Sequence, residues 1–153
     1  MRKTEREIQD RTEIDSIIRG SQVVRLGLSD GSDPYVVPLC FGYDGHHLYF
    51  HCAREGRKMD MLLRNNRVCF EFDHIDGFVE DDQACRWGLR YRSVIGFGTA
   101  SILETIEEKR QALALLMKQY SPSTFTFPEE VVSLTAVIKI RIESISGKHG
   151  RLV

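Results

Sequence analysis

The sequence predicts a mainly β protein, an antiparallel β-barrel with helices packed outside it. About six apolar runs rich in Val, Leu, Tyr and Phe are bounded by turn residues such as Asp44-Gly45, which is typical of a β-meander. The helical segments do not alternate regularly with these runs, which disfavours a parallel, doubly wound sheet. No G-x-G-x-x-G motif follows a strand, so the sequence carries no dinucleotide-binding fingerprint.

Length and charge narrow the class of protein further. With 153 residues, 42% of them hydrophobic, the chain is long enough for one core, so we expect residues 1–153 to form a single domain. The 21 basic and 22 acidic residues give a formal net charge of −1, which provides no field to attract nucleic acid or an anionic membrane. The start of the sequence lacks the apolar stretch of a signal peptide, and no run approaches the roughly 20 apolar residues of a membrane-spanning helix. These features predict a cytoplasmic protein.

The cysteines are spread along the chain without a C-x-x-C pair, and three of them lie in apolar, strand-like runs. In a cytoplasmic protein this pattern predicts reduced, mostly buried thiols and no disulfide framework. The four residues are Cys40, Cys52, Cys69 and Cys85.

The first predicted element is a short amphipathic helix. It starts at Thr12, a candidate N-cap, carries isoleucines at helical spacing, and ends at Gly20. A second short helix is predicted at residues 56–65. Between the two helices lie three strand-like runs, at residues 22–29, 34–43 and 46–52.

The middle of the chain predicts two more strands. One covers residues 67–74, and the acidic segment after it, residues 76–82, is interpreted as a solvated loop. The other is long, residues 89–103, and contains Gly96 and Gly98, where a strand can bend sharply to close a barrel.

A longer helix and a final strand complete the prediction. Thr105 and Glu108 form a capping-box pair ahead of the helix. The last strand, residues 135–145, alternates polar or β-branched residues with isoleucines, which predicts a half-buried strand. The apolar face of the helix is formed by Leu113, Leu116, Met117 and Tyr120.

The segment that carries the chemistry is the start of the second helix. Arg57 and Lys58 lie in its first turn, where a cation opposes the helix dipole at a cost of roughly 0.3–1 kcal/mol. A bound phosphate would offset that cost, because exposed backbone N–H groups, a close-approach glycine at Gly56 and two cations together make an anion site. The alternative is that both cations point into water or are balanced by Glu55.

A proline marks a second candidate site. Pro38 lies within the run at residues 34–43, and because proline cannot donate to a β-ladder, that strand is predicted to be at an edge or bulged. Its unpaired backbone groups are then free for a ligand such as the edge of a flavin ring. An ordinary edge strand, protected by proline against aggregation, is the alternative.

The histidine spacing argues against a metal site. On one strand, His47 and His51 share a face but lie about 13 Å apart at 3.3 Å per residue, too far for one ion. His46 faces the other way. The same alternation predicts that Leu48, Phe50 and Cys52 point inward, whereas Tyr49 and His51 point outward and are partly solvated.

Four runs together resemble the FMN-binding split barrels related to pyridoxamine 5′-phosphate oxidase, and most closely their nitroimidazole-resistance reductase-like branch. They are PYVVPLCFGY at 34–43, LYFHCAREGRKMDML at 48–62, YRSVIGFGTA at 91–100 and VIKIRIESISGK at 137–148. The resemblance covers nearly the whole chain in the right order. It implies a six-stranded antiparallel split β-barrel with flanking helices, a homodimer, and FMN in clefts between the subunits.

The resemblance also implies roles for individual residues. Arg57 and Lys58, after Gly56, hold the FMN phosphate. His51 lies beside the flavin and is the candidate catalytic residue, because an imidazole with an ordinary pKa of about 6.5 can donate a hydrogen bond or a proton to a substrate. The remaining implied cofactor-binding residues are Val36, Val37, Pro38, Leu39, Cys52 and Ser93.

The sequence departs from the oxidase itself at three places. Gly56 stands where the oxidase has serine, and His51-Cys52 stands where it has Tyr-Thr. The final segment, SISGKHGRLV, has no counterpart of the Arg and Trp that bind the oxidase's substrate. Oxidation of pyridoxamine phosphate is therefore not expected.

The leading hypothesis is a flavin reductase in which NADH or NADPH reduces FMN and a small acceptor, such as a nitroaromatic, takes the electrons. The flavin supplies this chemistry, so no catalytic triad or carboxylate pair is required. One alternative is a flavin-binding or sensing protein without enzyme activity. Another is a haem-binding or haem-degrading split barrel, with His51 or His149 as a ligand. No metal, nucleic-acid or membrane partner is expected.

Overall fold

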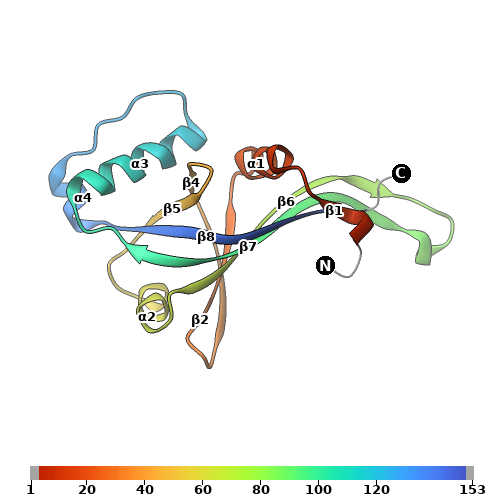
Figure 1. Ribbon diagram of the computed structural model, residues 1–153, viewed down its shortest axis with the longest axis horizontal. Coiled ribbons are helices and arrows are strands. Elements are labelled where there is room, and N and C mark those ends of the chain that lie inside the picture. The colour runs from red at the N-terminus through yellow and green to blue at the C-terminus, as the bar shows by residue number, and fades with distance from the viewer. Residues whose placement is uncertain (1–3, 151–153) are drawn as a thin grey trace.

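The computed structural model describes residues 4–150, whose strands form one antiparallel, eight-stranded sheet curled into a half-barrel (Figure 1). The strand order is β3-β2-β6-β7-β8-β5-β4, and β1 pairs with β8. The mainly β prediction is confirmed. The expected number of six strands was too low, because β1 (Glu7–Ile8) is a two-residue strand without a recognisable apolar run and β4 (Gly42–Tyr43) is a separate strand within the run at residues 34–43.

The other strands are β2 (Val24–Ser29), β3 (Pro34–Leu39), β5 (His47–Cys52), β6 (Arg67–Val79), β7 (Gly88–Ile102) and β8 (Ala136–His149). The helices are α1 (Arg11–Gly20), α2 (Arg57–Arg64), α3 (Ile106–Tyr120) and α4 (Glu129–Leu134), with short 3-10 helices at Thr4–Arg6 and Ala84–Arg86. Figure 1 shows β6 and β7 continuing past most of the sheet as a two-stranded arm. Part of the segment 76–82, predicted to be a loop, is therefore strand, because β6 stays paired with β7 as far as Val79 and bulges between Ile75 and Gly77.

The N-cap residues of α3 and α1 can be compared with those predicted from the sequence. Thr105 and Glu108 form the predicted capping box of α3. The predicted cap of α1 was wrong: the Asp10 side chain, rather than Thr12, is the cap and accepts from the Thr12 amide at 2.8 Å. An N-cap carboxylate satisfies a backbone donor that the helix itself leaves free.

The run at residues 34–43 divides into β3 and β4 because Phe41 leaves the ladder for the core. Its side chain is fully buried, and its amide donates to the Tyr120 hydroxyl at 2.9 Å instead of to a strand. Further along the chain, β7 changes register against β8 between Phe97 and Gly98, at the glycine pair where the sequence predicts a sharp bend.

The main core fills the concave face of the sheet. Phe72 lies at its centre, with ring centroids 5.0 Å from Phe41 and 6.1 Å from Phe70. Both α1 and α2 bury apolar side chains in this cluster. Helix α3 instead covers β4 and β5 from outside. Tyr49, predicted to be partly solvated, is consequently only 8% exposed and packs with Ala112 and Val137.

The cysteines are all free, as predicted, but their predicted burial was wrong for two of them. Cys40 and Cys85 are exposed, since Cys40 lies in the break between β3 and β4 and Cys85 lies at the tip of the arm. Cys52 and Cys69 are half-buried, and burial raises the pKa of both thiols.

Asp44 ties down the turn between β4 and β5, and it yields a prediction about acid stability. Its carboxylate accepts from the His46 amide at 2.8 Å, the His47 amide at 2.6 Å and the Tyr49 hydroxyl at 2.8 Å. Burial acts to raise its pKa, but these hydrogen bonds outweigh burial and hold the pKa at about 2. The folded pKa is thus below the unfolded value of about 3.9, so Asp44 stabilises the fold above about pH 4 and loses that effect toward about pH 2.

We expect Asp44→Ala to lower the free energy of unfolding at pH 7 by about 1–3 kcal/mol, with a smaller difference from the wild type near pH 2.5. Urea denaturation at both pH values measures the effect. Glu80→Ala, at an exposed position of the arm, is the control. A pH-independent difference would show that the hydrogen-bonded carboxylate is not its source.

Candidate functional site

The amino terminus of α2 presents free backbone donors. Gly56 is the N-cap, with a φ of 112° that favours glycine, and it offers no side-chain cap. A Cβ at this position would have no neighbour within 4 Å, so the approach to the first turn is open. Exposed N–H groups at a helix start form a ready-made site for an anion.

The two cations of this turn lie on aromatic rings. The Arg57 guanidinium is 4.8 Å from the centroid of Tyr35 in β3, and the Lys58 ammonium is 5.6 Å from that of Phe50 in β5. Arg57 is also 4.0 Å from an exposed Asp33 carboxylate. No ion pair within residues 4–150 joins Glu55 to either cation, so the interpretation that Glu55 balances them finds no support.

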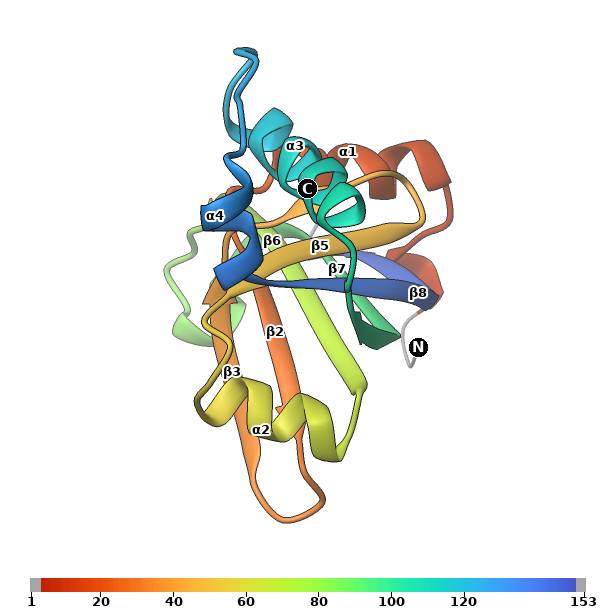
Figure 2. The ribbon, with the colours of Figure 1, turned by 90° about the vertical axis from the view of Figure 1, so that its left-hand side faces the viewer.

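Buried side chains fix the position of this turn. Met59, Met61 and Leu62 anchor α2 in the main core. Cys52, at the end of β5, places its sulfur 3.6 Å from that of Met59. In Figure 2 the connection from β5 runs down to α2 in front of β3. The first turn of α2 is therefore held between the ends of β3 and β5.

Strand β3 supplies a free backbone edge beside this turn. It stands at one end of the strand order, so one of its edges has no strand partner among residues 4–150. This confirms the edge position predicted from Pro38. Of its candidate flavin-contacting residues, Val36 is 65% exposed and Pro38 is exposed, whereas Val37 and Leu39 are half-buried.

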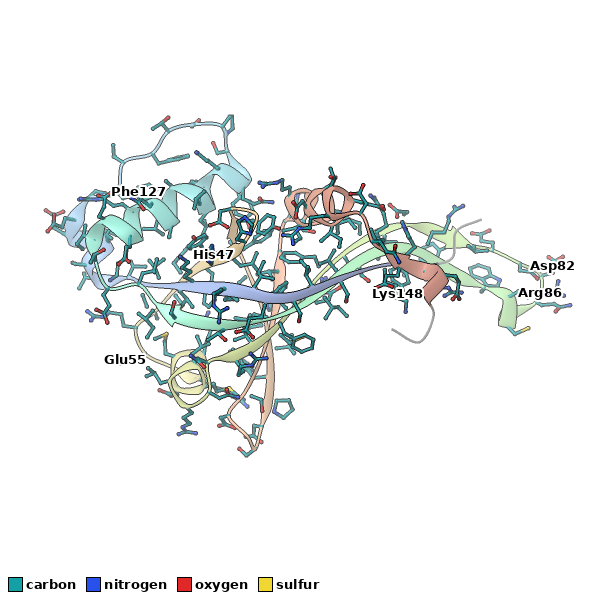
Figure 3. The ribbon with its side chains drawn as sticks, in the orientation of Figure 1. His47, Glu55, Asp82, Arg86, Phe127 and Lys148 are labelled. Carbon is teal, nitrogen blue, oxygen red and sulfur yellow. The ribbon has the colours of Figure 1, made fainter. Side chains whose placement is uncertain are left out.

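One predicted site residue lies elsewhere. Ser93 pairs with Lys148, whereas His51 pairs with Val137 at the other end of β8. Val137 and Lys148 are eleven positions apart, about 36 Å at 3.3 Å per residue. Figure 3 likewise shows Lys148 and Glu55 far apart. Within one chain, Ser93 therefore does not lie beside His51.

His51 borders a cavity. The strand alternation correctly predicted that its side chain is exposed. It opens on a space of about 310 Å³ between β5, α3 and α4. The other lining residues are Leu113, Leu116, Met117, Thr126, Phe127, Pro128, Val131, Val132 and Thr135. Three of them, Leu113, Leu116 and Met117, belong to the apolar face predicted for α3. That face of the helix therefore lines the cavity more than it contributes to the core.

Sequence reasoning missed the opposite wall of this cavity, α4. A signal for it exists: Pro128 precedes Glu129 and Glu130, and two valines follow. Proline at a helix start with acidic residues in the first turn is typical of a helix amino terminus.

The histidines of the β4–β5 turn take no part in either feature. His47 is hydrogen-bonded through Nδ1 to the Asp44 carboxylate at 3.0 Å, and His46 is exposed in the turn. No group of three or more His, Cys, Asp or Glu side chains in residues 4–150 is placed to hold a metal ion. In the same part of the chain, no helix has both the length and the apolar character needed to cross a membrane.

Comparison with known proteins places this geometry in a family. The family model for pyridoxamine 5′-phosphate oxidase matches residues 10–149. A solved structure of a candidate 5-nitroimidazole antibiotic resistance protein from Bacteroides thetaiotaomicron is 35% identical, with 94% of this chain and 86% of that chain covered and a TM-score of 0.85. No curated protein matches.

More distant structures share the fold. The FAD and haem binding protein from Mycobacterium smegmatis is 20% identical, with 96% of this chain and 74% of that chain covered and a TM-score of 0.87. A flavocytochrome from Azotobacter vinelandii is 22% identical, with 96% and 70% covered and a TM-score of 0.84.

Proposed function

The chain belongs to the pyridoxamine 5′-phosphate oxidase family, and from this premise we propose that it is an FMN-dependent oxidoreductase. The observation that carries the proposal is the open amino terminus of α2, where Gly56 leaves the backbone donors free and Arg57 and Lys58 flank them. The FMN phosphate binds there. The ring lies toward the free edge of β3, whose backbone groups hydrogen-bond its polar rim.

The aromatic contacts of the two cations support this assignment. Because Arg57 rests on Tyr35 and Lys58 lies near Phe50, both side chains lose less freedom on binding a phosphate than cations that extend into water. Lys58 also lies close enough to Cys52 for its charge to lower the pKa of that thiol, against the larger effect of burial. Arg57, Lys58 and Cys52 thus lie together around the start of α2.

The bound flavin supplies hydride and electron transfer, from NADH or NADPH to a small acceptor such as a nitroaromatic. The protein positions the reactants. His51 lies at the end of β5, ahead of the phosphate-binding turn, and we assign it the role of donating a hydrogen bond or a proton to the acceptor.

We expect His51→Ala to keep FMN affinity within about threefold and to lower turnover of a nitroaromatic acceptor by about 10²-fold, the lower end of the usual effect of general acid catalysis. His51→Gln, which retains a donor, recovers part of the loss. Steady-state oxidation of NADH and NADPH by FMN-saturated protein gives the measurement. His46→Ala, on the neighbouring turn, is the matched control, and wild-type turnover by His51→Ala would remove His51 from the mechanism.

We further propose a homodimer, formed through the convex face of β2, β3, β6 and β7. Val36, Gly27, Cys69 and Phe97 follow one another across these strands in register. Val36 is 65% exposed and Phe97 49%, an apolar surface suited to burial in an interface. They border a hollow of about 380 Å³. The face of β5 around Tyr49 is not available for this interface, because α3 of the same chain covers it.

This interface also accounts for Ser93. It lies on the same face of β7 as Phe97, four residues away, so it belongs to the surface that a second copy would cover. Under two-fold symmetry the same patch on both copies forms two equivalent sites. Ser93 of the second copy is therefore proposed to approach the flavin, whereas Ser93 of the same chain lies about 36 Å along β8 from the position that pairs with His51.

The dimer is tested by sedimentation equilibrium at micromolar concentration. We expect the wild type to be dimeric and Phe97→Asp to shift it toward monomer and weaken FMN binding at least tenfold, because a buried unpaired carboxylate is strongly unfavourable. Leu134→Asp, at a 72% exposed position of α4, should leave both unchanged. A monomeric wild type that binds FMN tightly would contradict the proposal.

The alternatives give different results in the same experiments. A flavin store or sensor binds FMN through the same residues and oxidises neither NADH nor NADPH. A haem-binding protein shows a Soret band on haem titration. To act as a haem ligand, His149 must first break its contact with Glu13, whose carboxylate lies 3.4 Å from the Nε2 atom of His149.

A further inference from the structure

Three charged side chains lie within the apolar face that the second copy is proposed to cover. Arg25 of β2 binds two carboxylates of β6: its guanidinium is 3.1 Å from Glu71 and also bonds Asp73. Arg25 pairs with Glu71 across the strands, and Glu71 pairs in turn with Ile95 of β7. The row of the proposed interface that includes Phe97 lies two residues away along each strand, so both rows belong to the same convex face.

We call Arg25, Glu71 and Asp73 the ion cluster, and it carries one more negative charge than positive charge. Its carboxylate side chains are 30% and 29% exposed, so part of their hydration is already lost in the single chain. Burial and the neighbouring charge of Asp73 raise the pKa of Glu71, and Arg25 opposes this effect. The single chain thus already favours proton uptake at Glu71.

The side chains beside the ion cluster on this face do not offset its excess charge. The nearest ones on the flanking strands are uncharged: Pro38 of β3, and Ser93 and Ile95 of β7. Beyond Ser93 lies Lys148 of β8, which pairs on its other side with Glu7 of β1. A cation and an anion thus stand opposite each other there, and they add no net charge to the face.

Two other titratable side chains lie near the ion cluster. His74 lines a hollow at its edge, where the Nε2 atom is 2.9 Å from the Ile17 carbonyl and 3.1 Å from the Ser21 hydroxyl, so the ring is engaged by the end of α1. The Cys69 thiol lies two residues from Glu71, and burial and the charge of Glu71 raise its pKa, which keeps it neutral near pH 7. Glu71 is therefore the group of this face that we expect to titrate on association.

From these features we propose that the dimer, and with it the flavin site, is regulated by pH, because each copy takes up a proton at its ion cluster when the two convex faces meet. This inference rests on the homodimer of the proposed function. A two-fold interface covers both clusters at once. Excess carboxylate charge is costly to remove from water unless a proton neutralises it. Since the dimer binds these protons more tightly than the monomer, protons favour the dimer, and association weakens as the pH rises toward 7.5.

Sedimentation equilibrium at pH 7.5 and 5.5, at one ionic strength and with FMN present, tests this proposal. Glu71→Gln removes the titrating group, retains an oxygen for Arg25, and leaves that guanidinium balanced by Asp73 alone. We expect its dimer to dissociate at least fivefold less than the wild-type dimer at pH 7.5, and equally at pH 5.5. The phosphate of FMN also titrates in this range, but it does so in both proteins and cancels in their ratio.

Glu130→Gln is the matched control, because it removes the same charge from an exposed position of α4, outside the convex face. Its dimer should follow the wild type at both pH values. Thermal melts confirm that both variants fold. A ratio of wild-type to Glu71→Gln dissociation constants that is the same at pH 7.5 and 5.5 would overturn the proposal.

The outcomes separate this inference from the proposed function. A wild type that is dimeric at both pH values, with an unchanged ratio to Glu71→Gln, contradicts the proton uptake and leaves the homodimer and the flavin site intact. Monomers of both proteins at both pH values contradict the homodimer and, with it, its regulation. Association that depends on pH through Glu71, in a protein that binds no flavin, supports the ion cluster and contradicts the oxidoreductase.

Discussion

Replacing Arg57 or Lys58 by alanine is expected to weaken FMN binding ten- to hundredfold. Each change removes one charge-assisted hydrogen bond to the phosphate, worth about 1.5–3 kcal/mol. The effect should be large because both cations lie on aromatic rings beside the open helix terminus, so a phosphate finds them already positioned. Titration of the flavin-free protein with FMN, followed by quenching of flavin fluorescence, measures the dissociation constants.

The control for these variants lies on the same helix. Arg64→Ala removes the same charge from the last turn of α2, at a side chain that is 68% exposed and paired with Asp30. We expect its FMN affinity to stay within twofold of the wild type. If Arg57→Ala and Lys58→Ala also stay within twofold, the phosphate does not bind at the start of α2.

The second large effect concerns stability. Gly42 lies where β4 passes against α3, and a Cβ there would come within 2.6 Å of the Leu116 amide nitrogen and 2.8 Å of the Leu115 carbonyl carbon. These are backbone atoms, so Gly42→Ala must displace the helix. We expect the free energy of unfolding to fall by about 1–3 kcal/mol. For a chain of this size, Tm falls by roughly 2–4 °C for each kcal/mol that is lost.

Gly27→Ala is the matched control, since its added methyl meets ordinary contacts of 3.5 and 3.6 Å at Cys69. Thermal melts of both variants make the comparison. A melting temperature equal to that of the wild type would mean that α3 tolerates a larger residue at this contact than its close approach implies.

Much of the fold could be predicted because its signals are local. The alternation of residues 135–145 and the capping box at Thr105 and Glu108 each identify an element from a few neighbouring side chains. Two predictions were wrong for a common reason. Tyr49 is buried by α3, and β3 ends early because Phe41 enters the core and its amide binds Tyr120. Both depend on contacts with residues distant in the sequence, which no local pattern records.

The same difference between local signals and contacts across the chain applies to the candidate site. The proposed phosphate-binding turn is contiguous, so a candidate anion site at Gly56, Arg57 and Lys58 could be predicted from the sequence. The cavity beside His51 could not, because it exists only where α3, α4 and β5 come together. Ser93 was assigned through the family resemblance, and its pairing at the opposite end of β8 from His51 could not be read from the sequence, because it depends on the register of strands distant in the chain.

The central claim is that a phosphate is recognised at the start of α2, and FMN compared with riboflavin tests it most directly. The two flavins share a ring and differ by the phosphate. The wild type should bind FMN at least 100-fold more tightly than riboflavin, and the double variant Arg57→Ala/Lys58→Ala should lose most of that preference with little change in riboflavin affinity. An equal preference for FMN in the double variant and the wild type would contradict the account.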